Sequence, residues 1–174
     1  HEFTGKTLGV VGFGSIGRVT AQKALAFGLK CLAYDPMLSG KSIDIGGTAV
    51  PLVTLDALLA SSDAVTLHLP LLPETRGLFS AATLDKMKQG ACLINTARGG
   101  IVDEKALAER LRSGRLGGAA LDVFEKEPAT DLSHFAGLTN LIATPHIAGV
   151  TSESNDRVSQ MIADEVIQFL GRST

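Results

Sequence analysis

Three side chains that could perform acid–base and anion-binding chemistry follow apolar stretches late in the chain. Arg98 follows ACLINTA, Glu127 follows GAALDVFEK and His146 follows NLIATP. An imidazole, with an ordinary pKa of ~6.5, is a suitable base for the proton of an alcohol, and a neighbouring carboxylate would fix its tautomer. A guanidinium binds a substrate carboxylate through two parallel hydrogen bonds. Singly, these residues could be a surface charge, a loop carboxylate and a packed imidazole, but together they predict a hydride-transfer site.

A second candidate site is the glycine-rich string GFGSIG at residues 12–17, which follows the apolar run TLGVV and precedes an Ala-rich stretch. This order is typical of the phosphate-binding turn of a dinucleotide site. Gly12 permits the tight turn, Gly14 lets a pyrophosphate approach the backbone, and Gly17 lets helix and strand pack closely. The free N–H groups at the helix start, with the hydroxyl of Ser15, would hold the phosphates. The alternative is a glycine-rich turn without a ligand.

Asp35 is placed to select the cofactor. It ends the next apolar run, 18 residues beyond Gly17 (35 minus 17), and no Lys or Arg follows it before Lys41. A carboxylate at this position accepts hydrogen bonds from the hydroxyls of an adenosine ribose and repels a 2′-phosphate. We therefore expect NAD rather than NADP, the alternative being a turn residue at a strand end.

The elements that must position these residues alternate along the chain. Short apolar runs, each flanked by helical punctuation, predict strands covered on both faces. They lie at 7–11, 30–34, 64–68, 91–95, 118–122 and 140–144. The fold class predicted is α/β, a doubly wound parallel sheet of Rossmann-like, three-layer α/β/α architecture.

Helices are predicted between these strands from their capping signals. The expected segments are 16–27 ended by Gly28, 55–60 capped by Thr54, a segment from Ser80 to Gly90, and one from Asp103 to Gly114. The final helix begins near Thr151 or Ser152, with Val158, Met161, Ile162, Val166 and Phe169 at helical spacing. Residues 36–49 and 123–137 are predicted loops at a sheet edge or rim.

Composition restricts the class of protein. The 174 residues are 45% hydrophobic and 20% charged with a net charge of -2 and no long basic run, so we expect no nucleic-acid partner. No apolar stretch approaches the ~20 residues of a membrane span, and no signal peptide is visible, so we expect a cytoplasmic protein without membrane attachment. Cys31 and Cys92 lie in apolar runs and are expected to be buried thiols, with no metal site.

Five strings along the chain together resemble one enzyme family. They are GKTLGVVGFGSIGR at 5–18, HLPLLPETRGL at 68–78, LINTARGGIVDEKAL at 93–107, GAALDVFEKEP at 118–128 and TPHIAG at 144–149. In this order they are similar to the NAD-binding domain of the D-isomer-specific 2-hydroxyacid dehydrogenases. The resemblance covers nearly the whole chain. It is strongest to the phosphoglycerate-oxidising members, although glyoxylate and lactate enzymes share much of it, so the substrate stays open.

The resemblance implies roles position by position. Arg98 matches the substrate-binding arginine, Glu127 the glutamate that pairs with the catalytic histidine, and His146 that histidine. The residues implied to contact the cofactor are Gly12, Gly14, Ser15, Ile16, Gly17, Asp35, Leu69, Thr96, Ala97, Arg98, Asp122, His146, Ile147, Ala148 and Gly149. His68 is expected to be structural and His134 to lie on the surface.

The resemblance also implies what surrounds this domain. Family members insert it between two segments of a substrate-binding domain, so we expect the chain, residues 1–174, to be the NAD-binding part of a longer enzyme that forms a homodimer or higher oligomer. The activity implied is NAD-dependent interconversion of a D-2-hydroxy acid and a 2-oxo acid, with the isolated chain weakly active or inactive because water would enter an uncovered site. The alternatives are an NAD-responsive corepressor-type binding module and a relative of S-adenosylhomocysteine hydrolase.

Overall fold

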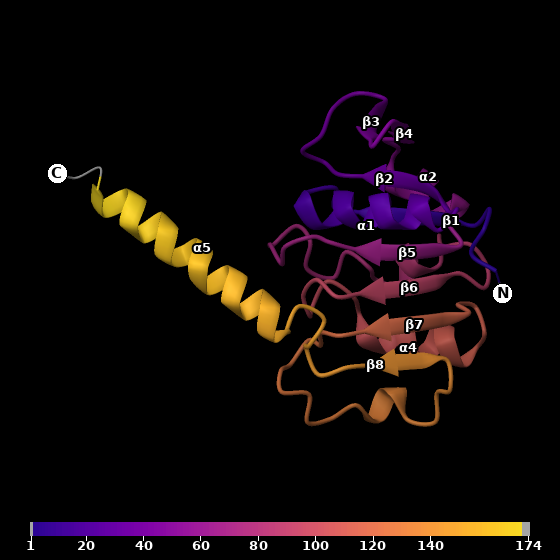
Figure 1. Ribbon diagram of the computed structural model, residues 1–174. Helices are drawn as coiled ribbons and strands as arrows, with labels where there is room; N and C mark the ends of the chain where they lie inside the picture. Colours follow the sequence, from indigo (N-terminus) through magenta and orange to yellow (C-terminus); the bar gives the residue numbers. More distant parts are fainter. Residues whose placement is uncertain (1, 172–174) are drawn as a thin grey trace.

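The computed structural model describes residues 2–171, in which six strands form one parallel sheet (Figure 1). The strands are β1 (Thr7–Val11), β2 (Lys30–Tyr34), β5 (Ala64–Leu67), β6 (Cys92–Asn95), β7 (Gly118–Leu121) and β8 (Leu141–Ala143). Their order is β2-β1-β5-β6-β7-β8, and every pairing is parallel. The chain therefore winds outward from β1 in both directions, which confirms the predicted doubly wound sheet and brings the carboxyl ends of all six strands to one edge.

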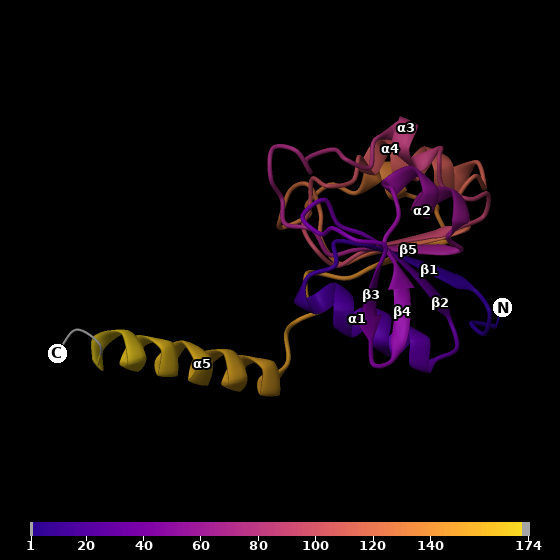
Figure 2. The same cartoon turned by 90° about the horizontal axis from the view of Figure 1, so that it is seen from above.

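Helices lie on both sides of this sheet. They are α1 (Ser15–Ala26), α2 (Leu55–Ser61), α3 (Ala81–Leu84), α4 (Glu104–Arg112), the 3-10 helix η1 (Ser133–Phe135) and α5 (Ser152–Gly171). Seen along the sheet, α1 covers one face, and α2, α3 and α4 cover the other (Figure 2). This arrangement gives the three layers predicted from the alternating sequence.

Side chains from the two sheet faces form two clusters of buried residues. The cluster on the α1 side contains Leu8, Val10, Ala21 and Ala24, and the larger one, on the side of α2 and α4, includes many leucines. Alternate residues of a strand point to opposite faces, so β1 contributes Val10 to one cluster and Val11 to the other. Each fully buried Leu or Val contributes ~1.5–3 kcal/mol through the hydrophobic effect. This packing gives the strand ends a fixed frame.

Both predicted loops contain regular structure, although residues 123–137 contain only the single turn η1. Residues 36–49 were expected to be irregular, but β3 (Ser42–Ile45) and β4 (Thr48–Pro51) form an antiparallel hairpin across the turn Gly46-Gly47. A Gly-Gly pair suits a two-residue hairpin turn, since both glycines adopt positive φ, 61° and 87°. Ile43 and Ile45 pack against the cluster on the α1 side. The expectation of a loop was wrong because the alternation of SIDI is too short to stand out.

The last helix is present, but its apolar residues are not buried. In both views α5 extends away from the sheet, and Val158, Met161 and Ile162 are exposed (Figures 1 and 2). The expected helix from Ser80 to Gly90 is likewise reduced to the single turn α3. Helical spacing therefore predicted the conformation of α5 without predicting a partner for its apolar side.

The outer half of the sheet is open on the α1 side. Cys92 of β6 is exposed, and so is Ile142 of β8, at 68%. The predictions that both cysteines are buried and that every strand is covered on both faces are thus wrong for this half, whereas Cys31 is buried as expected. Within residues 2–171, no helix combines the length and apolar character needed to cross a membrane.

Candidate active site

The glycine turn, residues 12–17, joins the end of β1 to the start of α1. A Cβ on Gly17 would overlap the carbonyl oxygen of Gly12, and a Cβ on Gly12, whose φ is 90°, would meet the carbonyl of His68. A Cβ on Gly14 would instead meet nothing within 4 Å. Gly12 and Gly17 therefore make the turn compact, while Gly14 leaves its outer side open to an approaching ligand.

The start of α1 suits an anion. Gly14 is the N-cap and provides no side-chain hydrogen bond, and the first bond to its carbonyl comes from the N–H of Arg18. The N–H groups of Ser15, Ile16 and Gly17 therefore have no acceptor inside the helix. Ser15 and Ile16 are exposed. Free N–H groups and the positive end of the helix dipole are what a pyrophosphate needs, so this turn fits a dinucleotide.

Asp35 lies beside this turn, at the end of β2. Its Oδ2 accepts a hydrogen bond of 2.8 Å from the N–H of Phe13, and its Oδ1 accepts one of 2.9 Å from the N–H of Met37. The carboxylate therefore fixes the glycine turn to the strand end. Each oxygen keeps further acceptor capacity, which a ribose hydroxyl could use.

The segment after β5 packs against the glycine turn. Leu69 is buried, and its Cδ2 would lie 3.1 Å from a Cβ on Gly12. His68 bonds through Nε2 to the hydroxyl of Thr66 at 3.1 Å, and burial lowers the pKa of its imidazole. The structure thus places Leu69 next to the candidate cofactor site and shows the packing role predicted for His68.

The turn that carries Arg98 follows β6 and is organised by Asn95. The side chain of Asn95 accepts from the N–H of Ala97 and donates to the carbonyl of Arg98, at 3.0 Å in each case. Thr96 and Arg98 are exposed, whereas Ala97 is buried. The guanidinium of Arg98 donates to the carbonyl of Ala97 at 2.6 Å. Sequence analysis missed Asn95, although a polar residue at the end of an apolar strand was a signal for it.

Asp122 holds the histidine turn, residues 144–148. Its buried carboxylate accepts hydrogen bonds from the Thr144 hydroxyl at 2.6 Å and from the N–H groups of Ile147 and Ala148 at 2.9 Å. Burial alone would raise the pKa of Asp122, but these bonds outweigh it and hold the pKa below its usual value. Asp122 therefore shapes the turn that presents His146, in which His146 adopts a φ of 55°.

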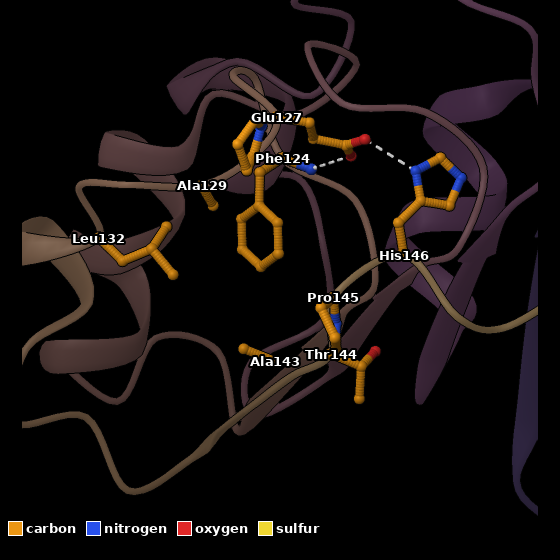
Figure 3. A pocket seen from close by; sticks show the side chains of 9 residues that line it. Phe124, Glu127, Ala129, Leu132, Ala143, Thr144, Pro145 and His146 are labelled. Atoms are coloured by element: carbon orange, nitrogen blue, oxygen red, sulfur yellow. Dashed lines mark hydrogen bonds and ion pairs between the residues drawn. The ribbon is translucent and has the colours of Figure 1, made fainter.

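Glu127 and His146 form the ion-pair geometry that the sequence predicted. The Nδ1 of His146 lies 2.7 Å from Oε2 of Glu127, and the N–H of Phe124 donates to Oε1 at 3.0 Å (Figure 3). The hydrogen bond from His146 contributes most to lowering the pKa of the Glu127 carboxyl, and the bond from the N–H of Phe124 lowers it further. An ionised carboxylate only accepts, so Nδ1 carries a proton and Nε2 of a neutral ring is left as the base.

A cavity of about 420 Å³ lies beside this pair. Apart from Glu127, Thr144 and His146, its lining is apolar: Phe124, Pro128, Ala129, Leu132, Ala143 and Pro145. Figure 3 shows Phe124 and Leu132 between the two loops that contribute these residues. The pair therefore has an apolar cavity on one side and is open to solvent on the other, since the side chains of His146 and Glu127 are 49% and 36% exposed.

Backbone hydrogen bonds join these turns along the carboxyl edge of the sheet. Gly12 donates to Tyr34, His68 to Val11, Asp122 to Asn95 and Thr144 to Leu121, at 2.8–3.0 Å. Each bond extends the pairing of adjacent strands by one step. Arg98, Glu127 and His146 therefore come from neighbouring strands β6, β7 and β8, on the same edge as the glycine turn.

Comparisons with known proteins agree with this arrangement. The model for the D-isomer specific 2-hydroxyacid dehydrogenase NAD binding domain matches residues 1–148. The chain is 51% identical over 171 residues to the (S)-sulfolactate dehydrogenase of Chromohalobacter salexigens, covering 98% of this chain and 55% of that protein. It is 44% identical over 168 residues to the D-3-phosphoglycerate dehydrogenase of Archaeoglobus fulgidus, covering 97% of this chain and 32% of that protein.

A solved structure shows the same fold. The D-lactate dehydrogenase from Aquifex aeolicus, complexed with NAD and lactic acid, is 35% identical and superposes with a TM-score of 0.86, covering 98% of this chain and 55% of that one. The chain thus spans about half the length of the sulfolactate and lactate dehydrogenases it matches, and about a third of the phosphoglycerate dehydrogenase.

Proposed function

The chain belongs to the D-isomer specific 2-hydroxyacid dehydrogenase family and carries its NAD binding domain, and from this premise we propose that it supplies the cofactor site and the acid–base pair of a longer enzyme. The proposed reaction converts a D-2-hydroxy acid and NAD⁺ into a 2-oxo acid, NADH and a proton. The observation that carries the proposal is the 2.7 Å contact between His146 Nδ1 and Glu127 Oε2, on the sheet edge that also bears the glycine turn.

The proposed reaction moves a hydride to the cofactor and a proton to His146. NAD, when bound, supplies the acceptor for the hydride that leaves C2 of the hydroxy acid. His146 takes the hydroxyl proton at Nε2, since Nδ1 is held by Glu127. Glu127 stabilises the imidazolium that results, because a carboxylate beside it offsets the new charge. In the reverse direction the same imidazolium returns the proton to the carbonyl oxygen.

Arg98 is proposed to bind the carboxylate of the substrate. Its side chain is exposed at the carboxyl edge, and in the structure it rests on the neighbouring carbonyl of Ala97. One hydrogen bond to a backbone carbonyl is readily exchanged for two to a carboxylate, because charge-assisted pairs are stronger. Binding the acid group orients C2 and its hydroxyl toward His146.

For the cofactor, we propose that the N–H groups of Ser15, Ile16 and Gly17 bind the pyrophosphate and that Asp35 binds the adenosine ribose. The open outer side of Gly14 supports the first assignment, and the position of Asp35 against Phe13 supports the second. Leu69, Thr96, Ala97, Asp122 and the backbone of 146–149 complete the proposed contacts on the nicotinamide side. Asp122 would act there mainly through the histidine turn, since both its oxygens already accept hydrogen bonds.

The substrate class that we propose is a short 2-hydroxy acid with a second anionic group. The two relatives described above are named for sulfolactate and 3-phosphoglycerate, and both of these are three-carbon acids of this kind. The higher identity, 51%, is to the sulfolactate enzyme, so 3-phosphoglycerate is one of two leading candidates. We propose that the cations for the second anion come partly from the part of the enzyme outside this chain.

The test is a panel of 2-oxo acids assayed for NADH consumption with the full-length protein, together with an NADH titration of this chain. We expect the chain to bind NADH and the full-length protein to reduce sulfopyruvate, 3-phosphohydroxypyruvate or both. NADH binding without turnover of any acid would contradict the enzyme and favour the corepressor-type module, for which no contact described above gives support. A chain that fails to bind NADH would contradict the whole proposal.

A further inference from the structure

Glu104, the first residue of α4, is a buried carboxylate outside the site described above. Its side chain is 11% exposed. Its Oε1 accepts a hydrogen bond of 2.6 Å from the N–H of Glu125, and its Oε2 lies 3.1 Å from Nε2 of His134. A carboxylate only accepts, so Nε2 of His134 carries the proton. His134 was expected on the surface, but this contact and a tilted ring contact with Phe135, 4.2 Å between centroids, make it half-buried.

The segment that Glu104 holds has little other support from its own backbone. Within the described residues 2–171, the N–H groups of segment 123–132 that donate hydrogen bonds are those of Phe124 and Glu125, and both acceptors are carboxylates. Glu127 accepts from Phe124, and Glu104 accepts from Glu125. The carboxylates of Glu127 and Glu104 therefore satisfy backbone N–H groups that a strand or helix would pair with backbone carbonyls.

These two bonds connect α4 to the acid–base pair. The N–H of Phe124 fixes Oε1 of Glu127 at 3.0 Å, and Oε2 of the same carboxylate contacts His146 (Figure 3). The two N–H groups lie at the ends of one residue, Phe124, whose buried side chain limits how far its backbone can rotate. Glu104 thus acts on Glu127 through the backbone of Phe124, without touching His146.

The turn that carries Arg98 packs closely against the Phe124–Glu125 peptide. A Cβ on Gly99 would overlap the carbonyl oxygen of Phe124 and lie 3.0 Å from the N–H nitrogen of Glu125. Only a residue without a side chain lets these two backbones approach so closely. The segment that carries Glu127 is therefore seated between the Arg98 turn and the first residue of α4.

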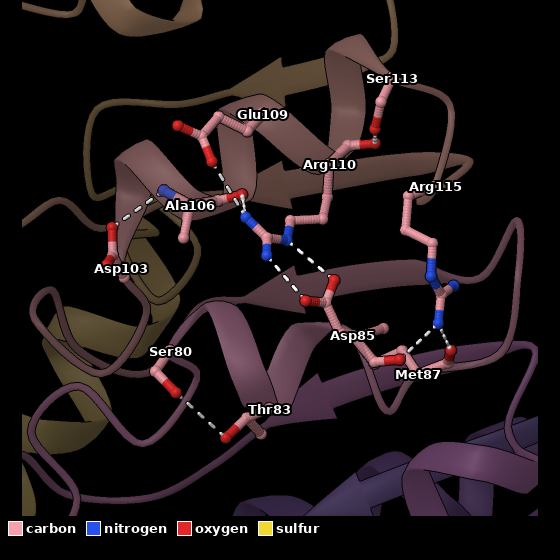
Figure 4. A network of polar contacts seen from close by, with 10 residues as sticks. All are labelled: Ser80, Thr83, Asp85, Met87, Asp103, Ala106, Glu109, Arg110, Ser113 and Arg115. Carbon is pink, nitrogen blue, oxygen red and sulfur yellow. Dashed lines mark hydrogen bonds and ion pairs between the residues drawn. The ribbon is translucent and has the colours of Figure 1, made fainter.

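Helix α4 itself is anchored on several sides. Asp103 caps its start by accepting from Ala106 at 2.9 Å, and Arg110 binds both carboxylate oxygens of Asp85 through Nε and Nη2 (Figure 4). At its end, Arg112 donates to the carbonyl of His134 at 2.9 Å. Because the first and last residues of α4 both hold the segment around His134, the helix is a firm support for it.

We infer that Glu104 is a positioning residue: with His134, it fixes the Phe124–Glu125 peptide so that Glu127 is held ready to orient His146. The importance of this for turnover rests on the proposed function, whereas the hydrogen bonds themselves are measurable without it.

The test uses NMR on this chain, labelled with nitrogen-15, in the variants Glu104→Ala, Glu104→Gln and Glu109→Ala. Glu109 is the matched control: the same residue type in the same helix, 70% exposed and paired with Arg110 (Figure 4). In Glu104→Ala we expect exchange of the Glu125 amide to accelerate at least about tenfold, and the side-chain nitrogen signals of His146 to move toward those of an imidazole without a fixed tautomer. Glu104→Gln keeps an acceptor for the N–H of Glu125. In this variant the exchange rate of Glu125 and the His146 signals should lie close to those of the unaltered chain.

Folding is checked by the amide spectrum of β1, β2 and β5, which lie away from α4. If Glu104→Ala does not fold, His134→Phe replaces it, since that variant removes the partner of Glu104 and keeps the carboxylate. Faster exchange of the Glu125 amide and a shift of the His146 signals in the same direction are then expected. Unchanged His146 signals in a folded Glu104→Ala or His134→Phe chain, or equal changes in Glu109→Ala, would overturn the inference.

In the full-length protein, Glu104→Ala should lower kcat about tenfold and leave the KM for NADH within about twofold, because the glycine turn is untouched. A kcat equal to that of the unaltered protein would also overturn the inference. If the unaltered protein shows the His146–Glu127 signals but reduces no 2-oxo acid, the proposed function fails while the positioning by Glu104 stands.

Discussion

The glycine turn and the histidine turn lie on the same edge of the sheet, but different atoms hold them in place. In the glycine turn, the fit depends on backbone atoms that approach each other closely, such as the carbonyl of Gly12 and the α-carbon of Gly17. In the histidine turn, the fit depends on the carboxylates of Asp122 and Glu127, which reach it from β7 and from the loop beyond it. The tight bend of the first site is therefore local in sequence, and one carboxylate, that of Asp35, ties it to the end of β2. The second site depends throughout on carboxylates from other segments.

This difference predicts that mutations will separate cofactor binding from chemistry. A side chain at the tight positions of the glycine turn, Gly12 and Gly17, should weaken NADH binding and the fold together, since the same backbone serves both. Changes in the acid–base pair should stop turnover and leave NADH bound. Four experiments test this separation, in order of decreasing expected effect.

The largest effect is expected for His146→Asn in the full-length protein. Asn tolerates the positive φ of this position, so the turn should keep its shape. Loss of the base should lower kcat by ~10²–10⁴-fold, while NADH affinity stays within about twofold. Steady-state kinetics with a 2-oxo acid and an NADH titration measure the two quantities. Equal losses in both would show that His146 supports the cofactor rather than the proton transfer.

Gly17→Ala should lower both stability and NADH affinity, in contrast to His146→Asn. Its Cβ would overlap the Gly12 carbonyl, so we expect the free energy of unfolding to fall by ~3 kcal/mol and NADH affinity to fall with it. Gly14→Ala is the control, because a Cβ there meets no protein atom; it should change stability by at most ~1 kcal/mol and still weaken NADH. Urea unfolding and NADH fluorescence give both values. A Gly14→Ala chain with unchanged NADH affinity would contradict the proposed pyrophosphate site.

Asp122→Asn should make the stability of the protein less dependent on pH, because it removes a carboxylate that holds the histidine turn. The pKa of Asp122 is lower in the folded protein than in the unfolded chain, so its contribution is complete above the unfolded value of ~3.9 and is lost as the pH falls through the folded value. We expect the variant to be less stable than the original by ~2 kcal/mol at pH 7. The difference should shrink between pH 5 and pH 3.

Urea unfolding across that range measures the difference, with Asp156→Asn on exposed α5 as the control for a lost charge. A constant difference at every pH would mean that Asp122 supports the histidine turn by its shape and not by its charge.

The smallest effect is expected for Asp35→Asn. The amide oxygen of Asn can still accept one of the two backbone bonds made by Asp35, so the fold should persist. The loss of the charge should reduce NADH affinity about tenfold and reduce the preference for NADH over NADPH. Parallel titrations with NADH and NADPH decide the matter: an unchanged ratio of the two affinities would remove Asp35 from cofactor selection.

The regions that sequence analysis described best are those whose constraints are local. The glycine turn, α1 and the strand that precedes them follow one another in the chain, and the residue types needed for each step lie within one short stretch. The ends of the later strands were equally readable, because each apolar run leads into a polar residue at a parallel-sheet edge. Membership of the family, the fold and the cofactor were therefore accessible from these strings, and the comparisons confirm them.

The predictions that were wrong concern what lies beside an element rather than what the element is. Cys92 sits in an apolar run but is exposed, because no helix of the described chain covers that face of β6. His134 was predicted to lie on the surface. It is instead half-buried, because its Nε2 forms a hydrogen bond with Glu104, thirty positions earlier. The apolar side of α5 likewise predicted a helix but not its surroundings. Spacing within a segment contains no information about which other segment will pack on it.

The glycine turn, the strands and the types of residue available for chemistry could be predicted from the sequence, since backbone propensity and local spacing act over a few residues. The contacts of Asp122 with the histidine turn and of Glu104 with Glu125 became visible in the folded protein alone. These contacts join segments up to 26 residues apart, and their geometry depends on the register of a six-stranded sheet. That register is set by the packing of the two clusters on its faces, a property that no single segment of the chain possesses.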